Sequence, residues 1–241
     1  MKIKGFIMYD GPSVLDGSPI VSIVTLKSGN VKTGDMAQQW IIRSDIDPVK
    51  ASKLRLDESI CGTCPHKQNH NGSCYVNIGQ APLAVFKGYK RGLYPVFDPE
   101  LHGHLLRYRK VRLGAYGDPA AVPYAYNAEV VSYCKAHTGY THQINHKNFD
   151  SRMAELCMVS ADSPKQAKKY QGQGFRTFRV SNADDTLYAN EIPCASDSGG
   201  VQCIDCGLCD GALNAPSIVI AVHGSRSKNF KTSNIQVLEI A

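Results

Sequence analysis

Apolar and polar positions along the second half of the chain predict strands and helices in turn. Short runs of apolar and β-branched residues are separated by amphipathic stretches, and Gly or Pro stands at most of the junctions. A helix is expected at 120–137, and another begins at Pro164, with Ser163 as its N-cap, and extends to about Gln171. Strands are expected at 111–116, 139–143, 156–160, 175–180 and 191–194, and 217–222 is expected to add an edge strand.

The first half of the chain carries fewer signals of regular structure. Residues 19–26 are rich in β-branched side chains and lie between glycines, which predicts a buried strand. A short helix is expected at 48–53, with Asp47 as its N-cap. A longer helix is expected at 82–91, because Gly92 directly follows it.

Strand and helix units joined by short connections favour a parallel sheet. Active sites of such folds gather at the carboxyl ends of the strands, and Asp118, His142 and Arg179 stand at or near these ends. The units are shorter than those of a full eight-fold barrel. We therefore expect an α/β fold, a compact or partial β/α barrel with cysteine-rich metal-binding loops. A three-layer open sheet is the alternative.

The composition fits one globular domain. The chain has 241 residues, of which 43% are hydrophobic and 20% charged, enough to bury a single core. We expect one domain over 1–241. An N-terminal strand and cysteine loop would occupy 1–110, the βα units 111–194, and a second cysteine loop with an edge strand 195–241.

Nine cysteines are unusual for such a chain. Disulfides belong to oxidising compartments and to small cores, and neither is indicated. The basic start at Met1–Lys4 precedes an apolar run of only 6–8, too short for a signal peptide. The longest later apolar run, 215–222, is far below the roughly 20 residues that cross a bilayer. We expect a cytoplasmic protein without membrane contact, whose clustered cysteines bind metal or do redox chemistry.

The most informative cysteines lie near the C-terminus. Cys203, Cys206 and Cys209 follow at C-x-x-C-x-x-C spacing, which resembles the loop that wraps a cubane [4Fe–4S] cluster. Cys194 could supply the fourth ligand. Zinc ribbons usually have two separate C-x-x-C pairs, so the overlapping triplet favours iron–sulfur over zinc. Zinc remains the alternative, because both metals favour thiolate.

An earlier group consists of Cys61, Cys64 and Cys74, with His66 and His70 between them. Three thiolates and one histidine could complete a tetrahedral zinc site. The same three thiolates could instead hold a second cubane, with one iron left open for a substrate or S-adenosylmethionine. The Cys-x3-Cys-x-x-Cys spacing usual for that chemistry is absent. The two remaining cysteines, Cys134 and Cys157, have apolar neighbours and are expected to pack in the core.

Three other residues are candidates for catalysis. Asp118 precedes Pro119, so it could cap a helix, bind a ligand, or do both. His142 could transfer protons or merely be packed and hydrogen-bonded. Arg179 and Arg176 are an odd number of positions apart on one strand, so one of them should face the interior. A buried arginine needs an anion, either a ligand or a structural carboxylate.

Much of the net charge of +6 comes from one segment. Residues 87–112 hold seven basic and two acidic side chains, interleaved with Tyr89, Tyr94 and Tyr108. This pattern suits a surface that contacts nucleic acid, because cations meet phosphates and aromatic rings stack on bases. A solvated helix face is the alternative. The basic residues are Lys87, Lys90, Arg91, Arg107, Arg109, Lys110 and Arg112.

Four short motifs follow in order along the chain. They are the Cys61, Cys64 and Cys74-Tyr75 segment, Val-Arg-Leu-Gly-Ala-Tyr-Gly-Asp at 111–118, Gly-Tyr-Thr-His at 139–142 and the cysteine tail 194–209. In this order they resemble bacteriophage proteins of the "gene product 88" kind. The resemblance implies a phage or prophage origin, hence a host cytoplasm, and a compact barrel related to radical enzymes. It implies no activity or substrate.

These features predict an iron–sulfur protein, a radical-SAM-like enzyme that acts on a small molecule or nucleic acid of unknown identity. One or two [4Fe–4S] clusters are expected. Cys194, Cys203, Cys206 and Cys209 would bind one, and Cys61, Cys64 and Cys74 a second cluster or zinc. Asp118, His142 and Arg179 would line the pocket, and S-adenosylmethionine is a candidate ligand. The alternative is a zinc-stabilised nucleic-acid-binding protein without catalytic activity.

Overall fold

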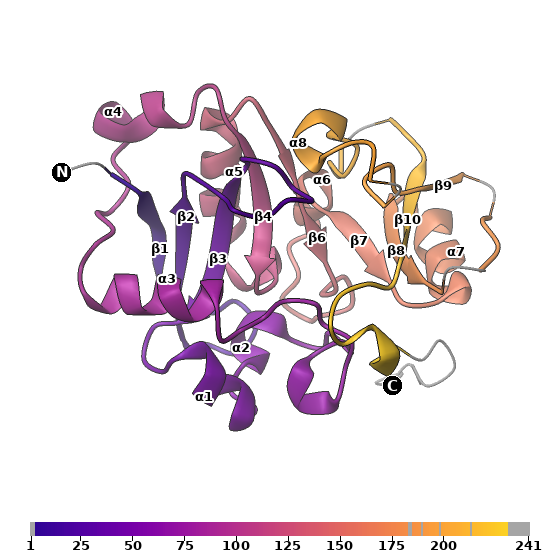
Figure 1. Cartoon of the computed structure of the whole chain (residues 1–241), viewed down its shortest axis with the longest axis horizontal. Coiled ribbons are helices and arrows are strands. Elements are labelled where there is room, and N and C mark those ends of the chain that lie inside the picture. Colours follow the sequence, from indigo (N-terminus) through magenta and orange to yellow (C-terminus); the bar gives the residue numbers. More distant parts are fainter. Residues whose placement is uncertain (1–2, 183–184, 189, 198, 213, 231–241) are drawn as a thin grey trace.

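Two five-stranded sheets form the centre of the molecule (Figure 1). The computed structural model describes residues 3–182, 185–188, 190–197, 199–212 and 214–230. The first sheet has the order β1-β2-β3-β4-β5, with β1 (Gly5–Pro12), β2 (Pro19–Thr25), β3 (Ala37–Arg43), β4 (Lys110–Tyr116) and β5 (Ala136–Thr138). The second has the order β6-β7-β8-β10-β9, with β6 (Tyr140–Thr141), β7 (Met158–Ala161), β8 (Thr177–Ser181), β10 (Ser217–Ala221) and β9 (Glu191–Pro193).

The two sheets meet at Gly139, which alone separates β5 from β6. Its N–H donates to the carbonyl of Cys209, and its carbonyl accepts from the N–H of Met158. β1, β2 and β3 are antiparallel to one another, whereas every pairing from β3 onward is parallel. The fold is therefore mixed α/β, and the described strands do not close into a barrel.

Helices cover both faces of the sheets. α5 (Tyr124–Tyr133) and α6 (Met153–Leu156) pack on one face of the first sheet, and α7 (Pro164–Gly172) packs on the second. The other face of the first sheet is covered by α2 (Glu58–Cys61) and α3 (Ala81–Lys90), with α1 (Pro48–Lys53) beside them. The remaining helices are α4 (Pro99–His102), α8 (Cys203–Cys206) and 3-10 turns at Gln68–His70, Gly103–Leu105, Pro119–Ala121 and Ser227–Asn229.

Alternation along β4 decides which residues reach the core. Val111 and Leu113 are buried against Val130 of α5, so Arg112, Gly114 and Tyr116 face the other side of the sheet. Among the described residues, no helix has the length and apolar character needed to cross a bilayer.

Most predicted elements are confirmed, often within two residues. Asp47 and Ser163 cap α1 and α7 through their side chains, as their position before proline predicts. The long helix expected at 120–137 is wrong, because its last part joins β4 as β5 and sheet hydrogen bonds outweigh local helix preference. The predicted edge strand β10 instead lies between β8 and β9. β1 and β3 were not predicted.

Candidate functional site

A pocket of about 350 Å³ lies on the sheet face opposite α5 and α7. Its floor consists of alternate residues of successive strands, as expected when every second side chain of a strand points to one face. These residues come from β4, from the β5–β6 segment and from three strands of the second sheet. They are Arg112, Gly114, Tyr116, Thr138, Tyr140, His142, Ser160, Phe178, Val180, Ile220 and Val222.

Seven of the nine cysteines line this pocket. Two loops that lie far apart in the sequence cover it, one from the first half of the chain and one from its C-terminal part. In Figure 1 the orange segment with α8, which carries the second cysteine group, lies above the strands, and the purple loop that follows α2 lies below them. Both sequence-predicted groups therefore line one pocket, namely Cys61, Cys64 and Cys74 from the first loop and Cys194, Cys203, Cys206 and Cys209 from the second.

The first loop is folded by its own backbone. Cys61 ends α2, and Gly62 follows with φ 51°, a conformation that favours glycine and turns the chain back. The N–H of Cys64 then donates to the carbonyl of Cys61 at 3.1 Å, and the N–H of Cys74 donates to His66 at 2.9 Å. These bonds fold the loop that carries the three thiols.

The second loop is anchored from several elements. The N–H of Cys194 donates to Val219 of β10 at 2.7 Å, and that of Cys203 donates to Lys32 at 3.0 Å. Arg176 donates to the backbone carbonyls of four residues around Cys209, namely Leu208, Asp210, Ala215 and Pro216. One arginine thus fixes the turn that carries the last cysteine.

Thiols within each group influence one another electrostatically. Burial, and then the neighbouring Cys64, raise the pKa of Cys74 to about 11. Burial also raises the pKa of Cys209 to about 12, against the lowering effect of the bond from Tyr140 and with smaller raising contributions from Cys194, Cys203 and Cys206. The thiols of Cys74 and Cys209 therefore keep their protons at neutral pH, and a metal bound there would have to displace them.

No three cysteine sulfurs among the described residues lie within 4.8 Å of one another. A tetrahedral zinc site with Zn–S bonds of about 2.3 Å places its sulfurs about 3.8 Å apart. The thiols therefore have no preformed tetrahedral zinc geometry. A cubane, whose thiolates bind different iron atoms, holds its sulfurs further apart.

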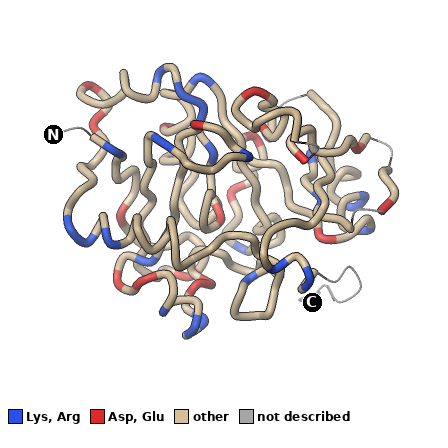
Figure 2. The backbone as a smooth tube through the Cα atoms, in the orientation of Figure 1, with Lys and Arg blue, Asp and Glu red and all other residues tan. Residues whose placement is uncertain are grey.

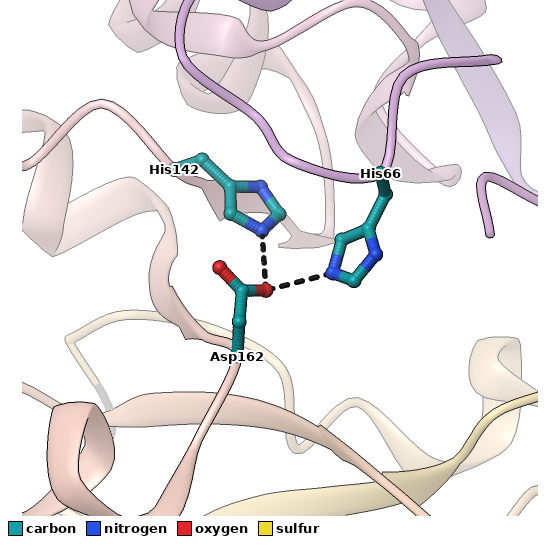
Figure 3. A group of neighbouring side chains, drawn as sticks. All are labelled: His66, His142 and Asp162. Atoms are coloured by element: carbon teal, nitrogen blue, oxygen red, sulfur yellow. Dashed lines mark hydrogen bonds and ion pairs between the residues drawn. The ribbon is translucent and has the colours of Figure 1, made fainter. Parts of the chain in front are cut away.

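A histidine–carboxylate cluster stands at the edge of the pocket (Figure 3). One oxygen of Asp162 lies 2.7 Å from Nε2 of His66 and 3.1 Å from Nε2 of His142. The Nδ1 atom of His66 lies 2.8 Å from the hydroxyl of Ser73, which fixes the ring. Burial lowers the pKa of His142, but Cys64 and Asp162 together raise it well above its ordinary value. The imidazolium of His142 thus lies between a thiol and a carboxylate.

Asp118 serves as a cap and as a brace. Its Oδ1 accepts from the N–H of Ala120 at 3.0 Å, as capping predicts, and its Oδ2 accepts from the N–H of His142 at 2.7 Å. Gln143 also donates to Oδ2 at 3.3 Å. Asp118 lines the pocket, but its oxygens hold the backbone that carries His142. Its place is that of a positioning residue.

Arg179 does not line the pocket. Its guanidinium donates to both oxygens of Glu191, at 2.9 and 2.7 Å, and both side chains are fully buried. The sequence left two possible partners for this arginine, an anionic ligand or a structural carboxylate, and its partner is the structural carboxylate. The role predicted for Arg179 in the pocket therefore has no geometric basis.

Arg112, which the sequence analysis placed only in the basic segment 87–112, belongs to the pocket. It is only 8% exposed, lines the pocket and donates to the hydroxyl of Tyr75. No carboxylate of a described residue forms an ion pair with it, and its Nε atom has no hydrogen-bond partner among them. The alternation with apolar Val111 and Leu113 predicts that Arg112 faces the other side of the sheet, but not that this side is covered.

The basic segment 87–112 does not form one surface. Lys87, Lys90 and Arg107 are exposed, whereas Arg112 is buried in a strand. Figure 2 shows Lys and Arg positions scattered over the backbone, with Asp and Glu positions among them. Of the two cysteines outside the pocket, Cys157 is buried in the core and Cys134 packs against the same cluster, as predicted.

Comparison with protein-family models, with curated proteins and with solved structures gives no match to this chain. The resemblance to phage "gene product 88" proteins therefore stays a prediction from the ordered motifs, and the function has to be argued from the site.

Proposed function

We propose that this protein is an iron–sulfur enzyme with two clusters facing one substrate pocket. One observation carries the proposal: seven cysteines from two distant segments line a single pocket of about 350 Å³. Structural metal sites normally lie in separate closed loops, whereas these two groups share a cavity with an arginine and a histidine. Cys194, Cys203, Cys206 and Cys209 would bind one cluster, and Cys61, Cys64 and Cys74 the other.

The spacing of the cysteines along the chain supports an iron–sulfur cluster over zinc. No three cysteine sulfurs of the described residues approach within 4.8 Å, so no tetrahedral zinc geometry is preformed. The overlapping C-x-x-C-x-x-C run of Cys203, Cys206 and Cys209 is the pattern that wraps a cubane cluster. We therefore prefer clusters at both groups, with zinc-stabilised nucleic-acid binding as the alternative.

The charge of the pocket also supports the proposal. Thiolate-bound clusters are anionic, and the buried Arg112 offers a positive charge with no carboxylate partner among the described residues. Burial lowers the pKa of Arg112, but Tyr75, Tyr140 and Cys203 more than offset this effect, so the guanidinium stays charged. Arg112 would thus stabilise negative charge inside the pocket.

His142 and Asp162 would handle protons. A proton on His142 is shared with Asp162 across 3.1 Å, and His66 contacts the same oxygen at 2.7 Å. His142 lines the pocket and could give this proton to a bound substrate or take one from it. Asp118 would hold the backbone of His142 in place through its 2.7 Å bond.

When bound, a cluster supplies one-electron transfer. Three thiolates would leave one iron of the first cluster without a protein ligand, open to S-adenosylmethionine. With an external reductant such as dithionite, the cluster and S-adenosylmethionine together would supply one-electron chemistry that takes one hydrogen atom from the substrate, with methionine and 5′-deoxyadenosine as the products. A partial barrel related to radical enzymes would agree with the parallel strands that floor the pocket.

Cysteine variants of anaerobically purified protein test the proposal. Cys64→Ala and Cys206→Ala should each lower iron and acid-labile sulfide by about half. Cys134→Ala, outside the pocket, is the matched control and should leave both unchanged. Incubation of the wild type with dithionite and S-adenosylmethionine should yield methionine and 5′-deoxyadenosine. Colourless protein that carries one or two zinc ions would overturn the proposal in favour of the zinc alternative.

A further inference from the structure

A second and larger cavity adjoins the cysteine pocket. This cleft has a volume of about 880 Å³ and is bounded by the end of β2, by β3, by α3 and by β4. Arg112 and Tyr75 line both cavities, so they form part of the wall between them. A ligand in the cleft would therefore lie next to the cysteine pocket.

The cleft is positively charged. Four basic residues line it, Lys4, Lys27, Arg109 and Arg112, and no Asp or Glu does so. Within the described part of the chain, none of these four forms an ion pair. Four cations without a carboxylate among the lining residues create a strong preference for an anion.

Three of the basic residues lie on segments that adjoin one another at one end of the cleft. The N–H of Leu26 donates to the carbonyl of Lys4 at 2.9 Å, and its carbonyl accepts from Nη1 of Arg109 at 2.8 Å. Lys27 follows Leu26 directly. This convergence suits a compact group of high negative charge, such as phosphate, better than charge spread along a chain.

Arg112 adds a buried donor that lacks an acceptor. Its side chain is more than nine-tenths buried, and its Nε atom has no hydrogen-bond partner among the described residues. Leaving a charged donor unpaired is costly, so a ligand atom that accepts from Nε would remove this cost. The arginine therefore favours a ligand that brings a hydrogen-bond acceptor to the wall between the two cavities.

Aromatic rings complete the cleft. Trp40 and Tyr94 line it together with Tyr75, and Trp40 is half-buried with its indole N–H bonded to Thr25 at 2.9 Å. Rings held in this way can stack on a planar base. The side-chain amides of Asn77 and Gln80 also line the cleft and offer donors and acceptors to the edge of a base.

We propose that this cleft binds a nucleoside phosphate, with its phosphate at Lys4, Lys27 and Arg109 and its base on the aromatic side. The ligand is either a free nucleotide or the terminal nucleotide of a strand. That this nucleotide is the substrate of the neighbouring pocket rests on the proposed function, but its binding to the cleft requires no cluster.

The test uses the full chain, purified anaerobically, with adenosine 5′-monophosphate as the probe. Calorimetry should detect binding, and the fluorescence of Trp40, the only tryptophan in the chain, should change on addition. The double variant Lys4→Gln/Lys27→Gln should weaken affinity about tenfold or more, because it removes two charged phosphate donors. The matched control, Lys53→Gln/Lys87→Gln, removes two exposed lysines outside the cleft and should bind like the wild type.

Other probes separate the sources of the ligand. A single-stranded oligonucleotide that binds more tightly than the mononucleotide would assign the cleft to a strand end, and equal or weaker binding would assign it to a free nucleotide. Inorganic phosphate that binds as tightly as the mononucleotide, equal weakening in both double variants, or no binding of either nucleotide probe would overturn the inference.

The two proposals can fail separately. If the purified chain holds no iron but binds the mononucleotide, and Lys4→Gln/Lys27→Gln weakens that binding, this inference is retained and the proposed function is overturned. A chain with two clusters that fails to bind either nucleotide probe overturns this inference alone.

Discussion

The Nε2 atom of His66 lies 2.7 Å from Oδ1 of Asp162, 96 positions further along the chain. This contact ties the first cysteine loop to the end of β7. The same oxygen also accepts from His142, so Asp162 connects the loop to two adjacent strands of the second sheet. Burial raises the pKa of Asp162, but both histidines lower it below the ordinary range, so the carboxylate stays charged.

Asp162→Asn should therefore destabilise the fold. Replacing the carboxylate removes charge-assisted hydrogen bonds, and the free energy of unfolding should fall by about 2 kcal/mol. Urea unfolding measures the change. Asp150→Asn, which breaks a surface ion pair with Arg152, is the control and should shift the midpoint little. Equal shifts in both variants would contradict a structural role for the cluster.

The buried pair of Arg179 and Glu191 predicts a pH-dependent stability. Burial raises the pKa of Glu191, but bonds from Arg179 and from the N–H of Tyr188 lower it below its ordinary 4.5. Because the folded pKa is the lower one, the contribution is complete above about pH 4.5 and is lost as the pH falls through the folded value. Glu191→Gln should cost about 3 kcal/mol at neutral pH.

Urea unfolding of this variant at several pH values measures both effects. Its stability should fall less steeply with acid than that of the wild type, because the titrating group is gone. Parallel curves in the acid range would contradict the assignment. Asp45→Asn, which breaks a partly exposed pair with Arg43, is a control and should cost far less.

Substitution of Arg176 is predicted to cause loss of the second metal site alone. Its guanidinium donates to four carbonyls around Cys209, and a lysine cannot make a planar fork of this kind. Arg176→Lys should lower iron by about half, through loss of the C-terminal cluster. Arg107→Lys, at an exposed position, should retain all iron. Full iron in both variants would show that the turn needs no such support.

Substitution of Gly62 is predicted to cause loss of the metal at the first cysteine group. Its φ of 51° disfavours any side chain, and an added Cβ would collide with the amide of Gln143, which bonds to Cys61 at 3.0 Å. Gly62→Ala should lower iron by about half. Gly29→Ala is the control, since its Cβ would meet nothing within 4 Å. Iron equal to wild type in Gly62→Ala would contradict the importance of this turn.

The sequence predicted elements whose signals are local. Asp47 and Ser163 predict where α1 and α7 begin, because an N-cap and a following proline determine the helix start within a single turn. β5 was missed because its pairing with β4, for example Lys110 with Ala136, is set by residues distant in the chain. The same holds for β1 and β3, whose pairing with β2 supplies the structure.

The candidate site divides in the same way. Spacing identified seven cysteines, all of which line the pocket, but spacing alone could not reveal that the two groups share it. Asp162 stands just before the predicted helix that begins at Pro164, and its bonds to His66 and His142 depend on the tertiary fold. The sequence indicated that Arg176 or Arg179 is buried, but it could not reveal that the buried Arg179 has Glu191 as its carboxylate partner.

The most direct measurement is the content of iron, acid-labile sulfide and zinc per chain in anaerobically purified protein. Two clusters predict about eight iron and eight sulfide, with little zinc. One or two zinc ions per chain, with no iron or sulfide, would contradict the account.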